Sequence, residues 1–307
     1  MGHDHEGHGH AGHAHAPANY GTAFLIGIGL NTVFVIVEAV FGVISNSVAL
    51  IADAGHNLSD VLGLAVAWIG TALAKRTPSS RFTYGLRGST ILAALFNAVF
   101  LLVGVGAIAW ESIGRLMHPA PVAGTTVMIV AAIGVVINGI TAWLFMSGRK
   151  GDLNIRAAYL HMVADAGVSI GVVIAGLVIV LTGWLWLDPL ISLVIVVVIV
   201  WGTWGLLRES VALSLAAVPS NIAPEKVSGY LAGLPGVAGV HDLHIWAMST
   251  TETAMTAHLI MPGGHPGDAA LAGFVHDLKH RFGIVHPTLQ IELGDAQACA
   301  LEPDVTV

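Results

Sequence analysis

The chain has 307 residues, of which 55% are hydrophobic and only 10% are charged, and its mean hydropathy is +0.79. Soluble proteins contain about 25% charged residues, so this composition indicates an integral membrane protein in a lipid bilayer. The net charge of −7 argues against nucleic acid as a partner, and the single cysteine excludes a disulfide framework and a cysteine-based zinc cluster.

Residues 1–18 form a low-complexity segment rich in histidine. Its six histidines alternate with Gly, Ala and acidic residues, and they are His3, His5, His8, His10, His13 and His15. The segment has no apolar periodicity and also lacks the basic start and apolar core of a signal peptide. We therefore expect a disordered tail that captures metal weakly, with a merely solvated tail as the alternative.

Six apolar segments follow, and each is close to the roughly 20 residues that a helix needs to cross a bilayer. They cover residues 21–44, 48–74, 89–110, 122–147, 154–182 and 186–208. This pattern predicts a domain of six transmembrane helices within residues 19–210. Basic residues gather in the loops after the second and fourth segments, whereas the opposite-side loops hold only Arg115. By the positive-inside rule, both termini are expected in the cytoplasm.

Two of the predicted spans carry the pattern His-x-x-x-Asp, as His56 with Asp60 and as His161 with Asp165. A spacing of four places each pair on one helical face. At about 1.5 Å per residue, each His lies about 12 Å and each Asp about 18 Å from the surface where its span enters. In antiparallel spans through a core about 30 Å thick, the two pairs then meet at one depth.

Two imidazoles and two carboxylates form a tetrahedral ligand set for Zn²⁺, and ionisable groups inside a membrane typically mark an ion pathway. We therefore predict a metal transport site at these four residues. Metal binding needs neutral imidazole and ionised carboxylate, so it displaces protons. Glu38 and Asp53 have two open interpretations: they support the site or pathway, or they are hydrogen-bond partners between helices.

Residues 211–295 change in composition and are predicted to form a soluble domain, followed by a tail at 296–307. The pattern predicts a helix at 224–234, strands at 237–248 and 253–261, a helix at 267–282 and a strand at 287–293. An α-β-β-α-β order is typical of an α+β sandwich with helices on one sheet face.

A second cluster of metal-ligating residue types lies in this domain. Its four candidate ligands come from separate strand regions, and they are His241, His258, His286 and Glu292. Gln290 and Glu292 share one face of the last strand because strand side chains alternate. We predict a metal site on the sheet, with scattered surface histidines as the alternative. Whether His244, His265 or His276 binds metal stays open.

Five ordered motifs resemble the cation diffusion facilitator family over residues 20–295: HNLSD at 56–60, TYG at 83–85, LHMVAD at 160–165, VHDLHIW at 240–246 and TLQIE at 288–292. The resemblance implies a homodimeric exporter in the inner membrane that exchanges cytoplasmic divalent metal for protons. It also implies a cytoplasmic ferredoxin-like domain that binds a regulatory Zn²⁺ and dimerises.

The position of His56 resembles the zinc-transporting branch of that family, in which His takes the first ligand position. The loop at 75–88 has neither His nor Asp, so the further metal site that some members carry there is not expected.

Other functions fit the same residues less well. A passive divalent-metal channel and a membrane metal sensor remain alternatives to a transporter. An intramembrane metalloprotease is disfavoured because His-Glu-x-x-His does not occur and a four-ligand shell leaves no position for a catalytic water. We therefore expect a transporter and not an enzyme.

Overall fold

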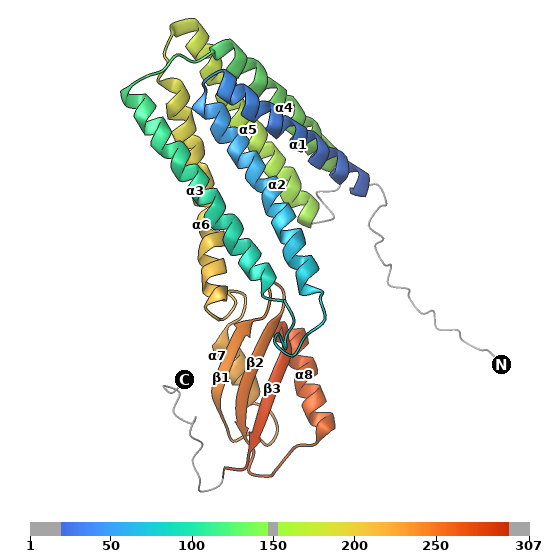
Figure 1. Cartoon of the computed structure of the whole chain (residues 1–307). Helices are drawn as coiled ribbons and strands as arrows, with labels where there is room; N and C mark the ends of the chain where they lie inside the picture. The colour runs from blue at the N-terminus through green and yellow to red at the C-terminus, as the bar shows by residue number, and fades with distance from the viewer. Residues whose placement is uncertain (1–19, 147–152, 295–307) are drawn as a thin grey trace, which may run out of the picture. The chain divides into compact units, whose positions relative to one another are not determined.

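The structure is a computed structural model that describes residues 20–146 and 153–294 (Figure 1). The His-rich tail and the C-terminal tail predicted from the sequence lie outside these residues. Six long helices come first in the described part: α1 (Tyr20–Ile44), α2 (Val48–Ala74), α3 (Ser89–Met117), α4 (Gly124–Met146), α5 (Leu153–Thr182) and α6 (Leu187–Ser214). The remaining elements are α7 (Pro224–Ala232), β1 (Gly239–Ala247), β2 (Thr253–Ile260), α8 (Asp268–Phe282) and β3 (Ile284–Glu292).

Four helices are long and apolar enough to cross a bilayer among the residues that the structure describes: Ser89–Met117, Gly124–Met146, Tyr159–Thr182 and Leu187–Ser214. A shorter apolar helix covers Gly29–Ile44. Helices form at all six segments predicted from the sequence, but six spans remain a prediction. Large hydrophobic side chains point outward along these helices, with Trp201 83% and Leu181 73% exposed. Such surfaces are typical of helices surrounded by lipid.

The described residues form two compact units, and the first comprises those up to 57 together with those between 112 and 192. Within it, α4 and α5 approach closely through small residues. A Cβ atom added at Gly176 of α5 would lie 2.9 Å from the backbone nitrogen of Met128 and 3.1 Å from the carbonyl oxygen of Gly124, both in α4. Small residues at helix contacts let backbones approach in membranes, where no hydrophobic effect drives helices together.

The start of α2 is held by an acid from the first turn of α6. The backbone N–H of Val48 donates to Oδ2 of Asp188 at 2.8 Å, and the Ser47 hydroxyl donates to Oδ1 of the same carboxylate. These bonds satisfy donors that a helix leaves unpaired at its N-terminus. They also hold the helix that carries His56.

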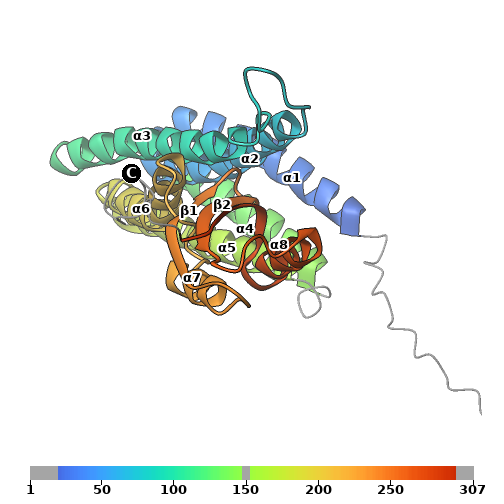
Figure 2. The ribbon, with the colours of Figure 1, turned by 90° about the horizontal axis from the view of Figure 1, so that it is seen from below.

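The second unit comprises residues 58–111 and the described residues from 193 onward, and it contains a three-stranded sheet in the order β1-β2-β3. Strands β1 and β2 are antiparallel, and β2 and β3 are parallel. Helix α7 packs beside β1 and α8 beside β3 (Figures 1 and 2). The predicted α-β-β-α-β order is confirmed in the described residues, whereas the ferredoxin-like fold stays a prediction.

Alternation along β2 separates a hydrophobic face from a polar one. Met255, Ala257 and Leu259 are buried in one core with Leu231 of α7 and Leu278 of α8. Because successive strand side chains point to opposite faces, Thr256 and His258 belong to the face that these helices do not cover.

Candidate metal sites

The first candidate site joins α2 to α5. The Nε2 atom of His56 lies 3.3 Å from Oδ1 of Asp165, and the Nε2 atom of His161 lies 3.6 Å from Oδ2 of the same carboxylate. Asp165 is only 2% exposed, and the two imidazole rings are 6.0 Å apart at their centroids. A buried carboxylate thus lies between two imidazoles from helices that are far apart in the sequence.

The fourth predicted ligand, Asp60, is one helical turn beyond His56 on α2. Its side chain lies outside the described residues. The structure therefore brings His56, His161 and Asp165 together, and the participation of Asp60 stays a prediction.

A buried polar cluster lies one helical turn from this site on both helices. The Ser169 hydroxyl, four residues after Asp165, donates to Oδ2 of Asp53 at 3.2 Å. The side-chain amide of Asn57 donates to Oε2 of Glu38 in α1 at 3.3 Å. These bonds link α1, α2 and α5 around the candidate transport site.

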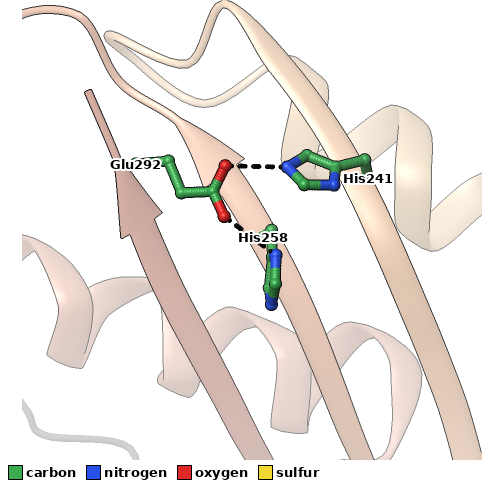
Figure 3. A group of neighbouring side chains, drawn as sticks. All are labelled: His241, His258 and Glu292. Atoms are coloured by element: carbon green, nitrogen blue, oxygen red, sulfur yellow. Dashed lines mark hydrogen bonds and ion pairs between the residues drawn. The ribbon is translucent and has the colours of Figure 1, made fainter. Parts of the chain in front are cut away.

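The second candidate site lies on the sheet of the soluble domain. The Nε2 atom of His241 lies 2.9 Å from Oε2 of Glu292, and the Nδ1 atom of His258 lies 2.9 Å from Oε1 (Figure 3). Ligand atoms of these three residues all lie within 4.8 Å of one another. Two imidazole nitrogens and a carboxylate oxygen within this distance fit a Zn²⁺ ion.

Strand register explains why three strands meet here. His241 of β1 and His258 of β2 are direct antiparallel partners, so their side chains share a face. Gln290 of β3 is paired with His258, and Glu292 lies two residues further on the same face. The predicted alignment of Gln290 and Glu292 is confirmed, because the Gln290 amide donates to Oε1 of Glu292 at 2.9 Å.

A β-bulge in β1 adds His244 to the sheet face that carries the cluster. His241 is paired with His258 but His244 with Thr256, so β1 has one residue more than β2 between these pairs. Asp242 has a φ of 51° at this point. A bulge shifts side-chain alternation by one, and it therefore turns His241 and His244 to the same sheet face.

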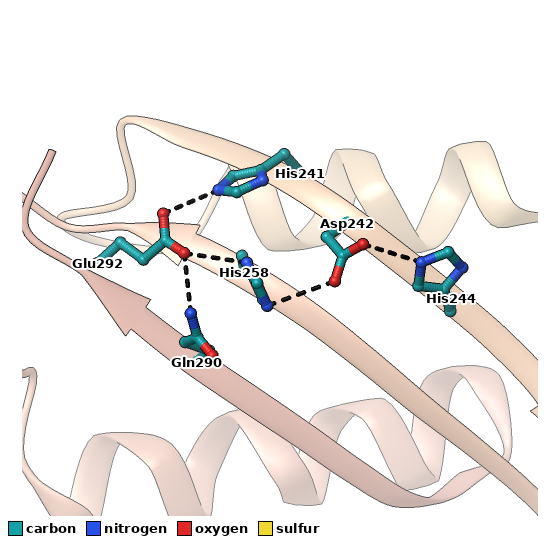
Figure 4. Close-up of polar contacts among 6 residues, drawn as sticks. All are labelled: His241, Asp242, His244, His258, Gln290 and Glu292. Atoms are coloured by element: carbon teal, nitrogen blue, oxygen red, sulfur yellow. Dashed lines mark hydrogen bonds and ion pairs between the residues drawn. The ribbon is translucent and has the colours of Figure 1, made fainter. Parts of the chain in front are cut away.

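Asp242 is a site residue that the sequence reasoning missed. Its Oδ1 lies 2.9 Å from Nε2 of His244, and its Oδ2 lies 3.4 Å from Nε2 of His258 (Figure 4). In a regular strand Asp242 would face away from His241, so the period-two pattern hides it. The only signal was its place between two histidines in VHDLHIW.

The structure does not bring His286 to this group. His286 is paired with Ala254, four residues before His258 on β2, and its ring packs edge-on against Tyr84 at 5.4 Å. At about 3.3 Å per residue, this register places it about 13 Å along the strand from the cluster.

The rings of His276 and His280, one turn apart on α8, lie 4.2 Å apart.

Two family models match the chain. The cation efflux transmembrane domain covers residues 24–213, and the cytoplasmic domain of cation efflux proteins covers residues 219–293. The first candidate site falls within the former match and the second within the latter.

Similar bacterial proteins match over most of their length. The chain is 34% identical to the "Cadmium, cobalt and zinc/H(+)-K(+) antiporter" of Bacillus subtilis, over 87% of this chain and 88% of the relative. It is 36% identical to the "Metal cation efflux system protein CzcD" of Cupriavidus metallidurans, over 96% and 91%. It is also 36% identical to the "Zinc transporter ZitB" of Escherichia coli, over 89% and 88%.

Proposed function

Because this chain belongs to the cation efflux family, we propose that it exports divalent metal ions, foremost Zn²⁺, in exchange for protons. The names of its relatives support zinc, cadmium and cobalt as metals and antiport as the mode of transport. The observation that carries the proposal is the buried Asp165 carboxylate between His56 and His161.

The transport site in this proposal consists of His56, Asp60, His161 and Asp165. Two imidazoles favour a borderline ion such as Zn²⁺, and the carboxylates supply negative charge that a dication offsets. Metal binds only where imidazoles are neutral and carboxylates ionised, so Zn²⁺ and protons compete for the same groups. A site that opens alternately to the two sides then couples metal exit to proton entry.

The architecture around the site is part of the same proposal. We place six transmembrane helices within residues 19–210 and a cytoplasmic ferredoxin-like domain at 211–295, with both termini in the cytoplasm. Six helical segments and the three-stranded sheet support this arrangement. Family membership and bacterial relatives support a homodimer in the inner membrane.

The cluster of His241, His258 and Glu292 is proposed as a regulatory Zn²⁺ site. Its geometry supplies three ligands of the types that Zn²⁺ prefers, and the buried histidines pair with Glu292 across three strands. Three protein ligands leave one coordination position open, which suits reversible occupation. In this proposal the bound ion crosslinks the three strands.

Zinc uptake into inside-out vesicles tests the function. Uptake that rises with an imposed pH gradient, together with proton movement in the opposite direction, supports antiport. Uptake that ignores the gradient favours the passive channel, and zinc binding without uptake favours the sensor. Asp165→Ala vesicles measure the background, and Glu111→Gln, an exposed acid of α3, is the matched control.

A further inference from the structure

Two carboxylates outside the proposed ligand set are buried beside it, Glu38 of α1 and Asp53 of α2. Both side chains have 0% exposure. Each has one oxygen that accepts a hydrogen bond, from Asn57 at 3.3 Å and from Ser169 at 3.2 Å respectively. Neighbouring helices therefore hold both groups in place.

The second oxygen of each carboxyl group has no such hydrogen bond within the part of the chain that the structure describes. Glu38 Oε1 and Asp53 Oδ1 are buried and accept no hydrogen bond from the donors of the described residues. The two carboxyl groups nevertheless lie within hydrogen-bonding reach of each other. Ionised carboxylate oxygens are acceptors only, so this contact is a hydrogen bond only when one group carries a proton. Two buried ionised carboxylates without a positive partner would be very costly.

A fixed cation does not offset this charge. Helices α1, α2 and α4 contain no Lys or Arg, and the single Arg of α5, Arg156, lies thirteen residues before Ser169, about 20 Å along the helix. Among the described residues, the titratable groups that act on Asp53 include Glu38, His56 and Asp165, and His56 already faces Asp165 at 3.3 Å. The compensating positive charge is therefore mobile.

A proton fits this position better than a metal ion does. Hard cations such as Ca²⁺ and Mg²⁺ take about six or more oxygen ligands. The pair offers at most four carboxylate oxygens, and two of these already accept bonds from Asn57 and Ser169. A single proton shared between two carboxyl groups needs only one oxygen from each group.

We infer that Glu38 and Asp53 share a proton and form the counter-ion site of the exporter. This inference rests on the antiport proposed above. Zn²⁺ that arrives from the cytoplasm at His56 and Asp165 displaces the proton to the cytoplasm. The pair takes up a proton from the outer side after Zn²⁺ has left there.

The helical spacing explains the coupling. Asp53 lies three residues before His56 on α2, and its partner Ser169 lies four residues after Asp165 on α5. One helical turn, about 5 Å, therefore separates the two sites on both helices. At such a distance inside a membrane, a divalent cation strongly disfavours a second positive charge.

Proton release on zinc binding tests the inference. The purified full chain in weakly buffered detergent is titrated with zinc, with a pH dye as the readout and bound zinc measured in parallel. Every protein in this experiment also carries His241→Ala and Glu292→Ala, which remove the cytoplasmic cluster. This double variant is the background to which the other substitutions are added. Glu38→Gln preserves side-chain size but cannot exchange a proton. We expect unchanged zinc stoichiometry and one proton fewer released per zinc.

Glu111→Gln is the control and should release as many protons as the unmodified background. An unchanged proton count in Glu38→Gln overturns the inference, and so does loss of zinc binding, which would make the pair a metal ligand. If Glu38→Gln does not insert into the membrane, Asp53→Asn provides the same comparison. Wild-type vesicle uptake that ignores pH would instead overturn the antiport itself.

Discussion

His258 of β2 contacts Asp242 at the β-bulge of β1, with Nε2 of the imidazole 3.4 Å from Oδ2 of the carboxylate. The opposite ring nitrogen, Nδ1, faces Glu292 at 2.9 Å. A histidine that binds metal typically donates its other ring N–H to a carboxylate, which sets the tautomer and ring orientation. Asp242 is therefore placed to direct the Nδ1 lone pair of His258 toward the proposed zinc position.

Replacing Asp242 tests this role. Asp242→Ala should weaken zinc binding at the cytoplasmic cluster by about 10–100-fold, the usual effect of losing such a partner. The measurement is competition with a chelator, on a full chain whose transport site is disabled by His56→Ala and Asp165→Ala. His244→Ala is the control, since it leaves the contact between Asp242 and His258 in place. Equal affinities in the two variants would show that Asp242 does not orient His258.

Removal of a transport-site carboxylate should abolish export. Asp165→Ala leaves two imidazoles without the buried anion that they face, and Asp60→Ala removes the other proposed oxygen ligand. Zinc uptake into inside-out vesicles measures the effect, and size-exclusion chromatography in detergent checks folding. Transport at the wild-type rate by either folded variant would contradict the four-ligand site.

Metal preference should follow the ligand at position 56. His56→Asp turns a shell of two nitrogens and two oxygens into one nitrogen and three oxygens. Imidazole suits Zn²⁺, while carboxylate oxygens suit harder ions with larger coordination numbers. We expect transport of Mn²⁺ or Cd²⁺ to rise relative to Zn²⁺ in vesicles that contain equal free concentrations of each metal. An active variant with the wild-type ranking would place selectivity elsewhere.

The close contact of α4 and α5 should be intolerant of added volume. A Cβ at Gly176 meets the backbone of Met128 and Gly124, which cannot move aside as a flexible side chain would. Gly176→Ala should therefore destabilise the protein by about 1–3 kcal/mol, the usual effect of overpacking. Thermal unfolding in detergent measures this loss. Gly171→Ala on the same helix, where no atom lies within 4 Å, should unfold like the wild type. Equal stability of the two variants would refute the close packing.

Sequence alone was sufficient for features that depend on local pattern. Apolar segments near 20 residues predicted the helices of the membrane domain, and alternation predicted the order of elements in the soluble domain. The pairing of His56 with Asp165 was also predictable, because helical pitch and membrane thickness together determine depth. The helices and the order of elements depend on short stretches of sequence, whereas the pairing of His56 with Asp165 also needed the thickness of the membrane as a common measure of depth.

Only the tertiary structure decided which residues share a face across strands and helices. The bulge at Asp242 turned His244 toward His241, and the register of β3 took His286 away from the cluster to Tyr84. The meeting of Glu38 with Asn57 and Asp53 depends on how α1 packs on α2. A one-residue change in register moves a side chain to the opposite face, and helix packing joins residues far apart in the chain. Strand register and helix packing cannot be predicted from composition and spacing, because contacts between elements determine both.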